Sequence, residues 1–214
     1  MSESPLNRHA GWIAVTAGGL FAVAHLGMFL VGDPSEPVAM MKDPLFLVFN
    51  GAYAITFPLL LIALVALYWR QAREVGVFGA IAFCTAITGT VALAGDMWFE
   101  GFAVPWLAQV APAVFDADRT GLLMSAWLVS SVLFSLGWVL FGLASLRGRT
   151  LPRTLAVVVA VGGLLGFKAA TPPWGVALGL AVAAVGAWTI RHEHASRSVH
   201  AHPVRIPATT AQAR

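Results

Sequence analysis

A series of long apolar segments, almost free of charge, constrains the fold of this chain more than any other feature. A helix needs about 20 consecutive apolar residues to cross a hydrocarbon core of about 30 Å. Six segments approach this length, at residues 11–31, 46–69, 76–98, 121–146, 152–170 and 174–190. Only 11% of the chain is charged, whereas a soluble domain carries about a quarter. The sequence therefore predicts an all-α polytopic membrane protein, a six-transmembrane-helix bundle.

Helices are favoured over strands because the segments lack alternation and are rich in Leu and Ala. Pro172 and Pro173 divide the last apolar stretch into two spans, since consecutive prolines mark a turn. The first segment is longer than the apolar core of a cleaved signal peptide and ends without a convincing small-residue cleavage site. We interpret it as a retained span that follows a short cytoplasmic lead at residues 1–10.

The distribution of Lys and Arg predicts the orientation, because these residues are enriched in cytoplasmic loops. Six spans place both termini and the second and fourth connections on one side. That side holds all 13 basic residues except Lys42, Arg119 and Lys168. Most tryptophans fall near the predicted span ends, as in the aromatic belt at headgroup level. The prediction is a multi-pass protein of the plasma (inner) membrane with both termini in the cytoplasm.

Two stretches outside the spans, the connection at residues 100–120 and the tail at residues 191–214, differ in composition from the short basic loops. The connection at residues 100–120 is apolar but interrupted by Pro105 and Pro112, so it is too short to cross and is expected to lie in the interface or to cap the bundle. The polar tail at residues 191–214 is predicted to be disordered and cytoplasmic, with weak metal binding by its histidine pairs as the alternative.

Small residues recur at four-residue spacing within the spans. This pattern lets helix backbones approach closely, so we expect the glycines to pack helices together. The pairs are Gly18 with Ala22, Gly162 with Gly166, and Gly175 with Gly179.

Away from the basic cytoplasmic ends, the strongly polar residues within the spans or one turn beyond them all fall toward the side that is predicted to face outward. They are His25, Asn50, Asp96, Glu100 and Lys168. Charged and strongly polar groups are costly in hydrocarbon and often mark a functional site. We therefore predict that these residues line a pocket for a ligand or a proton, with no metal and no cofactor.

Each of these residues also has a purely structural interpretation. Asp96 ends a stripe of small and polar residues and is expected to point into the bundle, with Glu100 one turn above it. Both carboxylates could instead mark the point where the helix enters water, and Lys168 could extend to the headgroups. His25 and Asn50 could serve only as hydrogen-bonding partners between helices.

Several chemistries are excluded by the residue inventory. Cys84 is the only cysteine, so an internal disulfide and a CxxC motif are ruled out. The spans hold one histidine, which cannot supply both axial ligands of a haem, and no HExxH, GxSxG or P-loop motif occurs. The net charge of +3 is too small and too dispersed to suggest nucleic-acid binding.

Three functions remain open. The favoured hypothesis is a small-molecule or proton-linked binding, sensing or transport-accessory role for the outward-facing pocket. The first alternative is a membrane-embedded enzyme for a lipid-like substrate, with His25 and a carboxylate as base and acid. The second is a structural membrane subunit without a ligand. The expected partners are membrane lipids and either a small molecule or another membrane subunit, and the sequence leaves the oligomeric state open.

Overall fold

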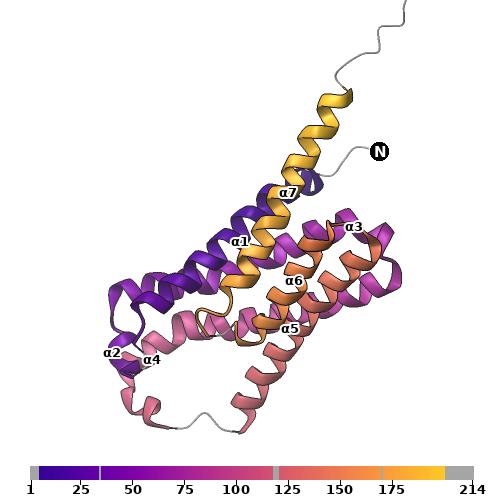
Figure 1. The fold of residues 1–214 in the computed structure, drawn as a ribbon. Helices are drawn as coiled ribbons and strands as arrows, with labels where there is room; N and C mark the ends of the chain where they lie inside the picture. The colour runs from indigo at the N-terminus through magenta and orange to yellow at the C-terminus, as the bar shows by residue number, and fades with distance from the viewer. Residues whose placement is uncertain (1–4, 34, 118–120, 170, 201–214) are drawn as a thin grey trace, which may run out of the picture.

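Helices make up almost the whole chain in the computed structural model (Figure 1), which describes residues 5–33, 35–117, 121–169 and 171–200. Within these residues there is no strand. The elements in chain order are α1 (Pro5–Val31), α2 (Pro37–Met40), α3 (Pro44–Trp98), the π-helical η1 (Phe99–Ala103), α4 (Val104–Val110), the 3-10 helix η2 (Pro112–Asp116), α5 (Gly121–Gly148), α6 (Arg153–Leu165), the 3-10 helix η3 (Gly166–Lys168) and α7 (Val176–His200). The predicted all-helical fold is confirmed.

Within the described part of the chain, three stretches are long and apolar enough to cross a membrane: His9–Val31, Pro44–Val110 and Gly121–Gly148. The second of these is far longer than one crossing, because it joins two helical arms through the non-helical Gly76 and then continues through η1 and α4. The third predicted segment ends at residue 98, but helical structure continues to Val110. These stretches support membrane insertion, as the composition predicts.

Helix α3 folds back on itself at Gly76. Gly76 has φ 58° and ψ −153°, a backbone conformation open mainly to glycine. Residues at similar distances on either side of this point meet: Tyr68 stacks on Phe83 with ring centroids 3.8 Å apart, and the side chain of Asn50 bonds to the backbone carbonyl of Glu100. The two arms are therefore antiparallel, and they correspond to the second and third predicted segments (Figure 1). We call the two ends of the bundle the Gly76 end and the α2 end.

The helix pairs pack through small residues. Helices α1 and α7 lie side by side (Figure 1), and a Cβ atom added to Gly18 would lie 2.4 Å from the carbonyl oxygen of Gly179. Only residues without side chains permit such an approach. The predicted packing role of these two glycines is confirmed. Helix α5 contacts both α3 and α6.

A ladder of aromatic rings fills the centre of the bundle. Phe57 contacts Phe21, Tyr53 and Phe134, with centroid distances of 5.1, 5.2 and 5.8 Å. Trp138 continues the ladder from Phe134 and donates a hydrogen bond to Thr90. Tilted and edge-on contacts of this kind add to the burial of the rings. They tie α1, both arms of α3 and α5 into one core.

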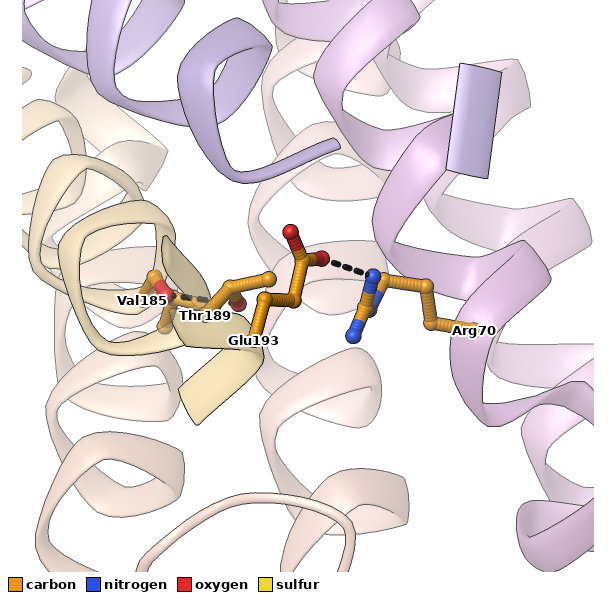
Figure 2. Close-up of polar contacts among 4 residues, drawn as sticks. All are labelled: Arg70, Val185, Thr189 and Glu193. Carbon is orange, nitrogen blue, oxygen red and sulfur yellow. Dashed lines mark hydrogen bonds and ion pairs between the residues drawn. The ribbon is translucent and has the colours of Figure 1, made fainter. Parts of the chain in front are cut away.

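The Gly76 end carries polar contacts both between helices and within one helix. Arg70 on α3 forms an ion pair with Glu193 on α7 at 2.5 Å, and Thr189 on α7 donates to the carbonyl of Val185 (Figure 2). Glu193 lies beyond the last predicted span, at residues 174–190, because α7 continues to His200. The first part of the predicted disordered tail is thus helical. Residues 201–214 lie outside the described residues.

The connection between α6 and α7 is the least regular part of the bundle. Helix α6 has 13 residues and ends at Leu165, well before the end of the predicted segment 152–170. The 3-10 helix η3 follows, and α7 begins only at Val176. Ala169 in this connection is nevertheless fully buried. The chain therefore has non-helical backbone packed among helices, and its polar groups need partners there.

Candidate functional site

A cavity of about 440 Å³ lies at the α2 end of the bundle. Both arms of α3 contribute to its wall, together with α1, α5, the segment around α2 and the connection before α7. Its lining residues are Met28, Phe29, Gly32, Met40, Met41, Phe46, Asn50, Tyr53, Asp96, Met97, Glu100, Leu123, Met124, Trp127, Thr171 and Pro172. The volume is typical of sites for small organic ligands.

Three of the five predicted site residues meet at this cavity: Asn50, Asp96 and Glu100. The fold-back at Gly76 brings them together, because Asn50 lies near the start of the first arm and the carboxylates follow the end of the second. Asn50 is buried, whereas Asp96 and Glu100 are half-buried. Oδ2 of Asp96 is itself buried. The expectation that Asp96 points into the bundle agrees with this placement.

The wide helical turn η1 explains the contact of Asn50. The N–H of Val104 bonds to the carbonyl of Phe99, five residues back, and so passes over the carbonyl of Glu100. The next residue, Pro105, has no N–H to offer. The amide Nδ2 of Asn50 donates to this carbonyl at 3.1 Å. Wide turns of this type occur often at functional sites, and this one places Glu100 in the cavity wall.

His25 is fully buried beside the cavity and does not line it. Its Nδ1 lies 2.8 Å from the carbonyl oxygen of Phe21, and its Nε2 lies 2.9 Å from that of Ala169. A neutral imidazole has a single N–H, so it donates to one of these oxygens at a time, whereas a doubly protonated ring donates to both. Gly175 packs directly against the ring, where a Cβ atom would clash. His25 thus supports the irregular connection before α7.

Tyr53 joins His25 to the cavity, although the sequence analysis did not single it out. Its hydroxyl donates to the carbonyl of Ala169, the same acceptor that His25 approaches. The two rings lie edge to face with centroids 4.5 Å apart, and Tyr53 also lines the cavity. Tyr53 lies three residues after Asn50 and therefore on the same side of a helix, a spacing in the sequence that indicates that the two side chains face the same site.

Lys168 lies apart from the other predicted residues. Its side chain is exposed, and Nζ lies 5.4 Å from the centroid of the Trp174 ring. It is not part of the cavity wall. Its carbonyl accepts from the hydroxyl of Thr171, which does line the cavity. Lys168 therefore helps to shape the turn beside the site through its backbone.

The turn before α2 closes another side of the cavity. The backbone N–H and hydroxyl of Ser35 both donate to Oδ1 of Asp33, and these hydrogen bonds lower the pKa of that exposed carboxyl. The turn holds α2 in place, and Met40 and Met41 reach the cavity from it.

Methionine was not among the residue types predicted for the site. Five of the six methionines line the cavity, and the sixth is Met1. They come from α1, α2 and its following residue, the second arm of α3, and α5. The only signals in the sequence were the pair at Met40 and Met41 and the position of Met97 next to Asp96.

Among the described residues, no group of three or more His, Cys, Asp or Glu side chains lies close enough together to hold a metal ion. Cys84 is exposed on the second arm of α3, away from the cavity lining. Comparison of the chain with protein-family models, curated proteins and solved structures gave no match.

Proposed function

We propose that this chain is a multi-pass protein of the plasma (inner) membrane that binds a small molecule in the cavity at its α2 end. In this proposal the chain crosses the membrane six times, both termini and the Gly76 end lie in the cytoplasm, and the cavity faces outward. Its role is binding, sensing or support of transport. The observation that carries it is the cavity itself, where polar residues from both arms of α3 meet an apolar wall.

The distribution of charge supports the orientation. Arg70 and Arg73 lie near the fold-back at Gly76, and Arg147, Arg149 and Arg153 lie around the α5–α6 connection. These two turns are at the same end of the bundle, since Arg147 contacts the ring of Phe78 and Thr150 bonds to Gln71. Basic residues concentrate on the cytoplasmic side of membrane proteins.

The polar groups of the Gly76 end favour binding over autonomous transport. The side-chain oxygen of Gln71 accepts from the hydroxyls of both Ser145 and Thr150, at 2.8 and 2.6 Å. Ser145 is fully buried, and Gln71 is nearly so. This network fixes α3 to α5 and to the turn that follows it. A hydrogen-bonded, buried cluster of this kind stabilises packing and gives no support to a continuous polar path across the bundle.

The enzyme alternative has weaker support. It needs His25 as base or acid, but both ring nitrogens face backbone carbonyls and the ring does not line the cavity. The contacts of His25 and Asn50 suit a structural role for these two residues. They leave Asp96 and Glu100, in the cavity wall, as the charged groups that a ligand would meet.

Native mass spectrometry of the protein purified with its own lipids tests the proposal. We expect a bound small molecule in the wild type. Met124→Trp should reduce its occupancy at least about tenfold by filling the cavity rim. Leu122→Trp is the matched control, because Leu122 lies two residues away, is 86% exposed and does not line the cavity. If both variants retain the same bound species as the wild type, the cavity is not the binding site.

A further inference from the structure

The cavity wall is rich in methionine, which gives it an adaptable shape. Methionine is unbranched, has three rotatable side-chain bonds and carries a polarisable thioether, so it repacks around apolar bodies of different shape. Met97 and Met28 are buried in the wall, whereas Met124 at the rim is 44% exposed. Five methionines drawn from four separate parts of the chain meet at one cavity. Such a wall suits an apolar ligand body.

Aromatic rings form the second part of the wall. Phe29, Phe46, Tyr53 and Trp127 all line the cavity, from α1, α3 and α5. Aromatic faces attract organic cations, and groups of rings recognise quaternary ammonium ligands in this way. Thioethers and rings together favour a polarisable, lipophilic partner over a strongly hydrated one.

The formal charge of the wall is negative. Asp96 and Glu100 line the cavity, and within the described part of the chain no Lys, Arg or His does so. Both carboxylates already make contacts within the protein. A positively charged ligand would therefore share or replace those contacts. An anionic ligand would meet like charge in a poorly solvated place, which disfavours it.

We infer that the cavity binds a lipophilic organic cation, a molecule with an apolar body and a single ammonium-type positive charge. The body would contact the methionines and rings, and the charge would face Asp96 and Glu100. The cavity of about 440 Å³ fits a drug-sized molecule of this kind. This inference names the ligand class for the proposed function and rests on it.

The rim of the cavity shows how such a ligand would enter. Leu123 and Met124 on the first turns of α5 line the cavity and are also exposed, at 50% and 44%. Leu122 and Leu128 on the same helix are exposed as well. In the proposed orientation these apolar residues face the outer leaflet. A lipophilic cation that partitions into that leaflet therefore reaches the rim without crossing water.

Tetraphenylphosphonium and tetraphenylborate test the inference, because they have nearly the same size and shape and opposite charge. The measurement is equilibrium binding to the full-length protein in nanodiscs of uncharged lipid, with protein-free nanodiscs as the baseline for partitioning. We expect saturable binding of the cation and binding of the anion that is weaker by at least about tenfold. Equal binding of the two ions would overturn the inference, as would no binding of the cation.

Charge-neutral variants then identify the carboxylates. Asp96→Asn and Glu100→Gln each keep the shape of the side chain, and we expect each to weaken binding of the cation several-fold and together by at least about tenfold. Glu36→Gln is the control, since Glu36 is an exposed carboxylate at the same end of the bundle that does not line the cavity. Unchanged affinity in both single variants, or an equal loss in the control, would contradict the assignment.

The same experiments separate this inference from the proposed function. If the anion binds as well as the cation and Met124→Trp abolishes both, the cavity binds small molecules without selecting cations, and only the inference fails. If Met124→Trp changes neither the binding of the cation nor the natively bound species, both fail. Since the comparison of the two ions uses the wild-type protein, it does not depend on how well the variants fold.

Discussion

At the scale of single residues, the need of one backbone carbonyl for a hydrogen-bond donor explains why two polar side chains are buried beside it. The carbonyl of Ala169 belongs to the non-helical connection before α7 and is surrounded by packed helices. Tyr53 donates to it, and Nε2 of His25 lies 2.9 Å from it. An unpaired backbone group in such a place costs free energy comparable to a lost hydrogen bond. His25 and Tyr53 therefore secure irregular backbone beside the cavity.

This sharing predicts non-additive stability. Tyr53→Phe or His25→Leu alone should reduce the free energy of unfolding by about 1 kcal/mol, since the side chain that remains can still donate to the carbonyl. The double variant should lose about 1–3 kcal/mol more than the sum of the two, because the carbonyl is then buried without a donor. Unfolding by denaturant in detergent gives the three values.

Tyr68→Phe provides the control for this cycle, because Tyr68 is the only other tyrosine and lies on the far part of α3, stacked on Phe83. It should show no coupling to His25→Leu. Strict additivity of His25→Leu and Tyr53→Phe would mean that the two side chains do not share an acceptor in solution.

At the scale of helices, close approach of backbones holds the outermost pair together. Helix α1 packs along α7, and the carbonyl oxygens and nitrogens of one helix lie where Cβ atoms of the other would be. A Cβ atom on Gly18 would meet backbone atoms of Gly179 and Ala183 at 2.4 and 2.6 Å. Backbone atoms cannot turn aside as a flexible side chain does, so the helices would have to separate.

Gly18→Ala is therefore expected to lower the free energy of unfolding by about 1–3 kcal/mol, the usual cost of overpacking. Gly19→Ala is a closely matched control, because Gly19 is the next residue of the same helix and a Cβ atom there would meet nothing within 4 Å. It should be neutral, or stabilising by up to about 1 kcal/mol through the higher helix propensity of alanine. Equal effects of the two substitutions would refute the close contact between α1 and α7.

At the scale of the whole molecule, the direction of the bundle decides which compartment the cavity serves. The fold-back places Glu74 at the Gly76 end of the bundle, and the turn around Ser35 lies at the α2 end. The proposed topology sets these two positions on opposite sides of the membrane. Both residues are exposed, so a reagent in the right compartment can reach them.

Cysteine labelling in intact cells measures which side of the membrane each of the two positions faces. In a Cys84→Ala background, which removes the only native cysteine, Ser35→Cys should react with a membrane-impermeant maleimide in intact cells. Glu74→Cys should react only after the cells are permeabilised. The opposite pattern would reverse the orientation, and labelling of both positions in intact cells would contradict the single crossing predicted between Ser35 and Glu74.

Local signals in the chain account for much of the site. Segment length and composition predict helices, and the positions of Asn50, Asp96 and Glu100 near the ends of neighbouring segments predict that they meet. The antiparallel arms of α3 bring them to one cavity. His25 and Lys168 fall at a similar predicted depth, yet neither lines it. Depth follows from position along a segment, whereas the direction around the bundle depends on contacts with other helices.

The sequence by itself determined that this chain is helical and apolar enough for a membrane, because hydrophobicity and helical period are properties of neighbouring residues. Tertiary structure alone decided that five methionines meet, that η1 turns Glu100 into the wall while Asn50 bonds to its carbonyl, and that Tyr53 and His25 share the carbonyl of Ala169. These contacts join residues far apart in the chain. They depend on how closely whole helices pack, which no short stretch of sequence specifies.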